Sequence, residues 1–293
     1  MQLSERHDLA TSRGRFHVRM TSGAGIPLVM LHGWPENSYC WTPVAARLPE
    51  RWRIIAPDLR GLGDSERTPG VAAYEKQQLA QDVLSVLDVL GVQRFHLVGH
   101  DWGGVVAQEM ALARPERVRS LCLLNIVLIN HARGLRAGTQ KIRDGGNLQA
   151  WYQQFQRMPG DLFERLVTGR EDVWLDFCFR KGQAGHQIPE EALREYIRMF
   201  RIPGTPGCGA SYYRAMPADA RRWALHAGRK YPMPALYIYG KQDPVIIPEY
   251  LDGSADAFQQ LSALHAIDAG HFVQEEAPDA VARHLAEFLQ PQD

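Results

Sequence analysis

The sequence has few cysteines, no surplus of charge of either sign and no long hydrophobic run. Its 293 residues include only four cysteines. They are far apart, and none forms a C-x-x-C pair: Cys40, Cys122, Cys178 and Cys208. This spacing argues against a disulfide framework or a zinc site and predicts reduced thiols in a reducing compartment. Lys plus Arg and Asp plus Glu each total 33, so no charge surplus indicates a nucleic-acid partner.

The start of the chain and its apolar runs bear on localisation. Residues 1–8 contain no apolar h-region, so we expect no secretory signal. No run approaches the roughly 18 apolar residues that a membrane span needs. The content of 45% hydrophobic and 23% charged residues is typical of a globular protein with one large domain or two ordinary ones. We therefore expect a cytoplasmic protein with no membrane partner.

Short apolar runs alternate with helical patterns in the first half of the chain. The clearest helical stretch spans residues 77–90, with apolar side chains at Leu79, Val83 and Val86, and ends at Gly91. Alternation of this kind predicts a mostly parallel, buried α/β sheet with helices wound on both faces. The strands that we expect are residues 27–31, 53–56, 95–98, 118–124, 235–239 and 264–268.

The pattern changes between His131 and Tyr231. The runs here are helical and amphipathic, with Pro-Gly interruptions at Pro159-Gly160 and at Pro203-Gly204, and no strand signal separates them. The α/β alternation resumes after Tyr231. The sequence thus predicts a core domain formed by residues 1–130 and 232–293, with a helical cap domain inserted as residues 131–231.

The most informative short segment is Gly99-His100-Asp101-Trp102-Gly103. It lies between an expected strand and a helical run, and its two glycines allow a sharp turn there. This arrangement is that of a nucleophile elbow, with an aspartate where such elbows usually carry serine. Serine at this point forms an acyl-enzyme, whereas a carboxylate forms an alkyl-enzyme ester. The pentapeptide alone also fits an ordinary strand–helix turn with a capping Asp, so the prediction depends on the rest of the chain.

Two further polar residues follow expected strands at equivalent points. Asp243 comes after residues 235–239, and His271 comes after residues 264–268. Singly, Asp243 before a proline suits a turn and His271 suits a cap. Because the carboxyl ends of parallel strands meet at one edge of a sheet, we expect both to approach Asp101. The order nucleophile, acid, histidine predicts a catalytic triad of Asp101, Asp243 and His271.

The segment His32-Gly33-Trp34-Pro35 directly follows the expected strand 27–31. In elbow-type sheets this loop supplies one backbone amide to an oxyanion hole, and the residue after the nucleophile supplies another. We therefore expect the amides of Trp34 and Trp102 to hold a negatively charged oxygen. Pro35 is a candidate for a cis peptide bond in a tight turn.

Together these motifs resemble those of the α/β-hydrolase-fold epoxide hydrolases, the aspartate-nucleophile branch that is related to the haloalkane and haloacetate dehalogenases. The resemblance covers essentially the whole chain and includes residues 58–65, which are similar to a loop common in that superfamily. It implies an α/β-hydrolase fold with an inserted helical cap. The core motifs are shared with the dehalogenases, so they specify the fold and nucleophile better than the substrate.

In epoxide hydrolases, two cap tyrosines donate hydrogen bonds to the epoxide oxygen. Tyr213, in Ser211-Tyr212-Tyr213-Arg214, resembles one of them, and Tyr152, in Trp151-Tyr152-Gln153, resembles the other. Packing alone would also explain buried aromatic residues in a cap. The resemblance implies an epoxide substrate, a vicinal diol product, a covalent ester on Asp101, and no metal or organic cofactor.

A dehalogenase that uses the same triad is the main alternative. Two departures weigh against it: the stretch after Asp101 carries no arginine to bind a carboxylate, and Trp34 stands where many haloalkane dehalogenases have Asn or Glu. Asn125 occupies the position after the sixth strand where some relatives place the triad acid, which leaves Asp243 in that role. A non-catalytic receptor would not need both Asp243 and His271, and a serine esterase lacks its nucleophile. The sequence leaves the preferred epoxide, the selectivity and the oligomeric state open, a homodimer included.

Overall fold

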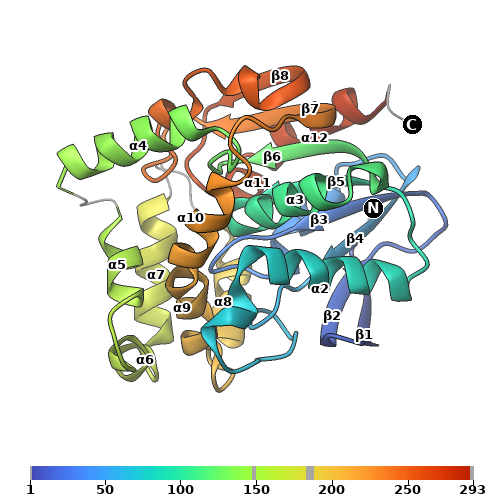
Figure 1. Cartoon of the computed structure of the whole chain (residues 1–293). Helices are drawn as coiled ribbons and strands as arrows, with labels where there is room; N and C mark the ends of the chain where they lie inside the picture. Colours follow the sequence, from blue (N-terminus) through green and yellow to red (C-terminus); the bar gives the residue numbers. More distant parts are fainter. Residues whose placement is uncertain (1, 147–149, 183–187, 291–293) are drawn as a thin grey trace.

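The computed structural model describes residues 2–146, 150–182 and 188–290. Its centre is an eight-stranded sheet in the order β1-β2-β4-β3-β5-β6-β7-β8, in which β3 to β8 run parallel and β1 and β2 are antiparallel (Figure 1). The strands are β1 Glu5–Thr11, β2 Gly14–Met20, β3 Ile26–Leu31, β4 Trp52–Pro57, β5 Phe95–His100, β6 Val118–Leu124, β7 Tyr231–Gly240 and β8 Phe258–Ile267.

The inner strands form where the sequence has continuous apolar runs. All six residues of β5 are buried, and the last five of β6 are buried as well. A strand that is covered by helices on both faces needs apolar side chains on both sides, so the run shows no alternation. The predicted mostly parallel α/β sheet is confirmed, and each of the six expected strands overlaps an observed one.

The antiparallel pair β1–β2, which forms one edge of the sheet, was not among the expected strands. The residues of β1 alternate between exposed and half-buried, as is typical of an edge strand with one face toward solvent. Because β1 consists mostly of polar residues, it contains no apolar run that would indicate a strand. Strand β7 likewise begins at Tyr231, four residues before the expected start.

Helices cover both faces of the sheet (Figure 1). Helices α2 and α3 pack together on one face, and α1, α11 and α12 contact one another. Helix α11 begins at Val273, directly after the loop that carries His271. The bounds are α1 Thr42–Ala45, α2 Lys76–Val89, α3 Asp101–Ala113, α11 Val273–Glu276 and α12 Pro278–Leu289, with 3-10 turns η1 Ser38–Trp41, η2 Val71–Tyr74, η3 Pro115–Arg117, η4 Pro248–Leu251 and η5 Ser254–Ala257.

The described residues between β6 and β7 form helices joined by loops, without a strand, and lie to one side of the sheet (Figure 1). Its helices are α4 Ala132–Asp144, α5 Trp151–Gln156, α6 Leu162–Val167, α7 Glu171–Gly182, α8 Glu190–Phe200, α9 Thr205–Arg214 and α10 Met216–Ala224. Helix α9 contacts η2, and α8 contacts η1. The division of the chain into a core and a cap domain stays a prediction. None of the helices in the described ranges combines the length and apolarity needed to cross a membrane.

Candidate active site

Asp101 stands at a sharp turn between β5 and α3. Its φ of 48° lies in the left-handed region, which costs a non-glycine residue of order 1 kcal/mol or more and is common at functional sites. The turn is tightly enclosed. A Cβ on Gly33 would lie 2.4 Å from the Asp101 Cβ, and one on Gly103 would lie 2.3 Å from the His32 carbonyl oxygen. These two positions therefore require glycine, and together they fix the carboxylate of Asp101 at the carboxyl edge of the sheet.

The two oxygens of the Asp101 carboxylate have different surroundings. Oδ1 accepts a hydrogen bond of 2.8 Å from the Trp34 backbone amide, and Trp34 precedes Pro35 through a cis peptide bond, as expected. Oδ2 lies 3.6 Å from Nε2 of His271. Among the described residues, the Trp102 amide makes no hydrogen bond to this carboxylate, although Trp102 follows it directly. One oxygen is thus anchored by an amide, and the other faces the histidine.

His271 is brought against Asp101 and Asp243 from a loop of its own. Its Nδ1 lies 2.8 Å from Oδ2 of Asp243, so the ring lies between the two carboxylates. The other oxygen of Asp243, Oδ1, accepts the amides of Val245 at 2.7 Å and Ile246 at 3.0 Å. The structure thus brings together the three residues of the predicted triad, although they are far apart in sequence.

Asn125 supports Asp243 from the end of β6. Its side-chain Nδ2 donates to Oδ2 of Asp243 at 2.6 Å and to the Gly270 carbonyl at 3.2 Å, while its Oδ1 accepts the Gly240 amide at 3.1 Å. Its backbone has a φ of 41°, a conformation that Asn tolerates better than most residues. Asn125 therefore connects the ends of three neighbouring segments to the carboxylate that orients His271.

Burial and neighbouring charges set the protonation of Asp101 and His271. Burial by itself raises the pKa of Asp101, but His271 and the Trp34 amide lower it, and the net pKa lies below its ordinary value of 3.8. Burial lowers the pKa of His271, but the carboxylates of Asp243 and Asp101 outweigh it and raise the pKa well above 6.5. In the resting site an ionised Asp101 therefore faces a protonated His271.

Tyr152 and Tyr213 line the same small cavity as Asp101 and His271. The cavity has a volume of about 30 Å³ and is otherwise lined mainly by aromatic and apolar side chains. The tyrosine rings lie 5.9 Å apart at 82°, and the Trp34 ring stacks on Tyr152 at 5.9 Å. Burial raises the pKa of both hydroxyls, Tyr213 strongly, so both remain protonated donors. All seven residues that the sequence singled out thus lie in or beside one site.

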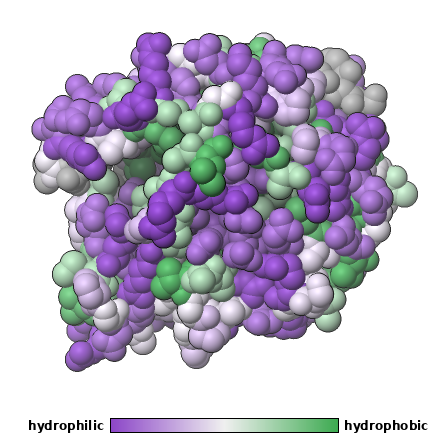
Figure 2. Space-filling view, in the orientation of Figure 1, coloured by the Kyte–Doolittle hydropathy of each residue, from purple (hydrophilic) through white to green (hydrophobic). Residues whose placement is uncertain are grey.

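A second cavity, of about 290 Å³, shares four lining residues with the first: Asp101, Tyr152, Tyr213 and Val245. It extends along α4 and α5, where Ile142 and Gln153 are among its lining residues. Figure 2 shows a hollow with hydrophobic residues inside it just below α4. The carboxylate of Asp101 therefore lies between a narrow chamber and a wide one.

Sequence reasoning missed a buried polar group behind the triad. Nδ1 of His100 lies 3.1 Å from Oε2 of Glu36, and Nε2 of His100 lies 2.8 Å from the backbone carbonyl oxygen of His271. The side-chain amide of Gln274 donates a hydrogen bond of 2.7 Å to Glu36. Burial raises the pKa of Glu36 to about 8 and that of the adjacent Glu275 as well, so this carboxyl pair retains a proton at neutral pH. Glu36 directly follows the Trp34-Pro35 motif, which is the signal that could have revealed it.

One group of potential metal ligands lies away from this site. The ligand atoms of His17, Asp58 and Asp64 lie within 4.8 Å of one another. Asp58, however, accepts the amides of Ser38 and Asp64 at 2.8 Å each, and the Asp64 carboxylate is paired with Arg198 at 3.1 Å. Both carboxylates are therefore already occupied in holding loops together.

The family model for the α/β hydrolase fold matches residues 26–278, which is most of the chain and includes every residue of the triad. The chain belongs to the α/β hydrolase family. It is therefore a hydrolase, and the predicted fold class and enzyme class are both confirmed.

Relatives of this α/β hydrolase include several epoxide hydrolases. Epoxide hydrolase A of Mycobacterium tuberculosis is 30% identical over 95% of this chain and 95% of that protein. A fluoroacetate dehalogenase of Burkholderia sp. is 29% identical over 92% of this chain and 89% of its own length. The solved structure of the epoxide hydrolase CorEH superposes with a TM-score of 0.85 at 28% identity and covers 99% of both chains. The resemblance inferred from the motifs is thus confirmed at the level of the whole chain.

Proposed function

We propose that this α/β hydrolase is an epoxide hydrolase, which opens an epoxide to a vicinal diol through an ester on Asp101. The observation that carries the proposal is the unequal environment of the Asp101 carboxylate: Oδ1 is anchored by the Trp34 amide at 2.8 Å, while Oδ2 faces His271 at 3.6 Å and is free to attack. The epoxide hydrolases among the relatives support the same conclusion.

In the first step, Oδ2 of Asp101 attacks one epoxide carbon. A C–O ester bond forms, and the C–O bond of the strained ring breaks. The electron pair of the broken bond goes to the epoxide oxygen, which takes a proton from Tyr152 or Tyr213. An alkoxide is a poor leaving group, so this activation is needed, and tyrosine donates without carrying a charge at neutral pH. The buried, apolar cavity strengthens these hydrogen bonds.

The ester removes the Asp101 charge that helps to keep His271 protonated. In the second step, the neutral form of His271 removes a proton from water, and the resulting hydroxide attacks the ester carbonyl of Asp101. The tetrahedral oxyanion forms on Oδ1, which the Trp34 amide already holds, with the Trp102 amide as a second donor. Collapse of this intermediate breaks the bond between Cγ and Oδ2 of Asp101, and the leaving oxygen takes the proton from His271. The remaining carboxylic acid proton of Asp101 returns to the tyrosinate, so that the diol is released and the site is restored. Asp243 keeps the ring in the required orientation and tautomer. No step calls for a metal or organic cofactor.

We assign residues 131–231 as the cap domain that supplies both tyrosines, and residues 1–130 and 232–293 as the core that supplies the triad. A narrow chamber of about 30 Å³ beside a wide one of about 290 Å³ favours an epoxide with one small and one large substituent. A cytoplasmic location, the absence of a nucleic-acid or membrane partner, and homodimer formation stay predictions.

The decisive experiment measures products from styrene oxide, which carries one large group, a phenyl ring, and only hydrogen at its other positions, in H₂¹⁸O. With wild-type protein we expect a diol, and ¹⁸O in the Asp101 carboxylate after repeated turnover. Tyr213→Phe should lower the rate of diol formation about 10²-fold, the cost of removing one such hydrogen-bond donor. No diol from any epoxide of this shape would overturn the proposal.

A dehalogenase remains the second candidate because the indole N–H of Trp34 is buried without a hydrogen-bond partner among the described residues. Together with the indole of Trp102, it would cradle a halide that Asp101 displaces from carbon. Parallel incubation with a 1-haloalkane and with fluoroacetate separates the two functions. Halide release that survives Tyr213→Phe, with no diol from styrene oxide, would assign the chain to the dehalogenases.

A further inference from the structure

Lys76, the first residue of α2, is completely buried, and its cation is shared between two helices of the region between β6 and β7. Its Nζ pairs with Oδ2 of Asp219 on α10 at 2.7 Å and also donates to the backbone carbonyl of Tyr212 on α9. Its backbone amide donates to Oδ1 of Asp219 at 2.9 Å. Both side chains of the ion pair are at most 1% exposed, so neither charge is solvated by water.

The same cation lies against the nucleophile elbow. Its Nζ is 4.1 Å from the centroid of the Trp102 ring, within the range of a cation–π interaction. The Trp102 ring in turn meets the Tyr213 ring at 5.5 Å and 76°. Lys76 therefore contacts both partners of the ring contact between Trp102 and Tyr213. It contacts Trp102 directly, and it is linked to Tyr213 through the backbone carbonyl of Tyr212.

Stability alone is a weak reason for this arrangement. Withdrawing two charges from water costs several kcal/mol per ion, and a well-packed apolar pair of similar volume is often as stable or more so. A second core-to-α10 ion pair, between Arg222 and Glu109 at 2.9 Å, already joins α10 to α3. The Lys76 ammonium adds a hydrogen bond to the backbone carbonyl of Tyr212, which an apolar side chain would not provide.

We propose that Lys76 is a positioning residue for Tyr213: by holding the Tyr212 carbonyl and the Trp102 ring together, it fixes the hydroxyl that activates the epoxide oxygen. The proposal rests on the proposed function, because it assumes that Tyr213 acts in ester formation. Lys76 does not touch the substrate. Its loss should slow ester formation, while hydrolysis of an ester already formed should change much less.

The test is a double-mutant cycle between the Lys76 pair and Tyr213. Lys76→Met with Asp219→Asn neutralises both charges, and the Asn keeps an acceptor for the backbone amide of residue 76. Rapid-quench measurements give the single-turnover rates of ester formation and of ester hydrolysis with styrene oxide. We expect the paired substitution to slow ester formation about tenfold, and Tyr213→Phe to cost at least about fivefold less in that background than in the wild type.

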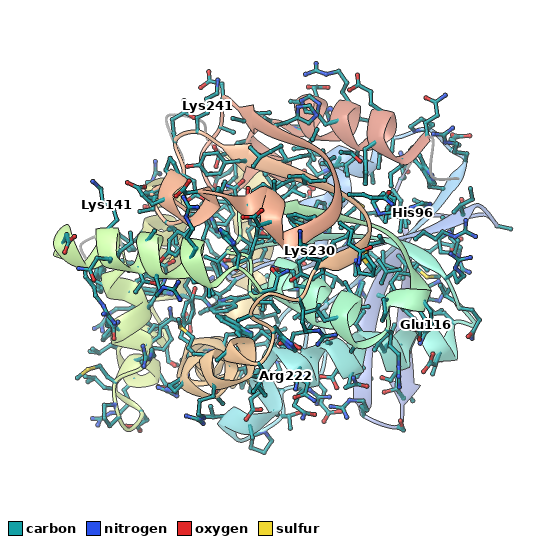
Figure 3. The ribbon with its side chains drawn as sticks, turned by 45° about the horizontal axis from the view of Figure 1, so that its top comes forward. His96, Glu116, Lys141, Arg222, Lys230 and Lys241 are labelled. Atoms are coloured by element: carbon teal, nitrogen blue, oxygen red, sulfur yellow. The ribbon has the colours of Figure 1, made fainter. Side chains whose placement is uncertain are left out.

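The matched control is Arg222→Met, which removes the other ion pair between α10 and the core. Arg222 lies on α10 as well (Figure 3), but its ion-pair partner is Glu109 rather than a residue that touches Trp102 or Tyr212. We expect this variant to leave the effect of Tyr213→Phe unchanged. If the paired variant does not fold, Lys76→Met with Asp219→Leu provides an apolar replacement for the same cycle.

Each outcome decides between the proposals. If Tyr213→Phe slows ester formation in the wild type but its effect is the same in both backgrounds, the positioning role is overturned and the proposed function stands. If the control weakens the Tyr213 effect as much as the Lys76 pair does, generic loosening of α10 explains the result and the positioning role is again overturned. If Tyr213→Phe leaves ester formation unchanged in the wild type, the role of Tyr213 is wrong, and the role of Lys76 falls with it.

Discussion

At the scale of single residues, His271 divides the proposed reaction into two separable steps. It faces Oδ2 of Asp101 at 3.6 Å, yet only the second step requires it as a base. We expect His271→Gln to slow ester hydrolysis by about 10²- to 10⁴-fold while ester formation continues. Intact-protein mass spectrometry should then show an adduct that equals the mass of the epoxide. Asp101→Asn should form no adduct, and an adduct on that variant would contradict the assignment of the nucleophile.

The two steps should also differ in their dependence on pH. Asp101 has a pKa below 3.8, so its ionised form and ester formation should persist as the pH falls. Ester formation removes the Asp101 charge that helps to raise the pKa of His271, so the histidine of the intermediate releases its proton more readily. Hydrolysis needs the neutral ring and should therefore rise with pH through that lowered pKa. Rapid-quench kinetics from pH 5 to 9 test this, and a hydrolysis rate that is flat over this range would contradict it.

At the scale of the elements, the end of β6 connects the sheet to the triad. Asn125→Gly keeps the positive φ but removes the hydrogen bonds to Asp243 and to the Gly240 amide. We expect the free energy of unfolding to fall by about 1–3 kcal/mol, the cost of unsatisfied buried polar groups, and ester hydrolysis to slow because Asp243 loses a fixed orientation.

A suitable control is Asn130→Ala, which also removes buried hydrogen bonds but to the carbonyls of Arg229 and Ala257. Urea unfolding and single-turnover kinetics on both variants separate stability from catalysis. Equal hydrolysis rates in the two variants would show that Asn125 contributes only to stability.

The elements also show what the sequence could reveal. The approach of Asp101, Asp243 and His271 to one another was predictable because each follows a strand that the sequence indicated, and the carboxyl ends of parallel strands lie at one edge of a sheet. The buried Glu36–Glu275 pair was not, because Glu275 lies next to Glu276 in a run that looks like a solvent-exposed helix start. The burial of Lys76 could not be predicted for the same reason: nothing in the sequence around this lysine indicates that it pairs with an aspartate 143 residues away. Long-range pairing of charges is decided by the fold and has no local pattern.

At the scale of the whole molecule, the buried carboxyl pair couples stability to pH. The pKa of Glu36, about 8 in the folded protein, is raised above its ordinary 4.5, so the folded state holds a proton that the unfolded state has released. The free energy of unfolding should therefore fall as the pH rises from about 4.5 to about 8.

Glu36→Gln removes this titration and should reduce the fall by at least about 1 kcal/mol. Urea unfolding at pH 5, 6, 7 and 8 checks this. Glu116→Gln is the control, because Glu116 is exposed beyond the end of α3 (Figure 3). An identical pH dependence in wild type and Glu36→Gln would mean that Glu36 is ionised in the folded protein.

The unequal anchoring of the two Asp101 oxygens has a stereochemical consequence. In the proposed mechanism only Oδ2 attacks, because Oδ1 is held by an amide, and displacement at carbon requires that the leaving oxygen depart from the opposite side. The attacked carbon is therefore inverted, and its neighbour is not. A symmetrical cis-epoxide, which is achiral, becomes a chiral diol whose handedness depends on which of its two mirror-related carbons faces Asp101. The site would then create asymmetry in a molecule that had none.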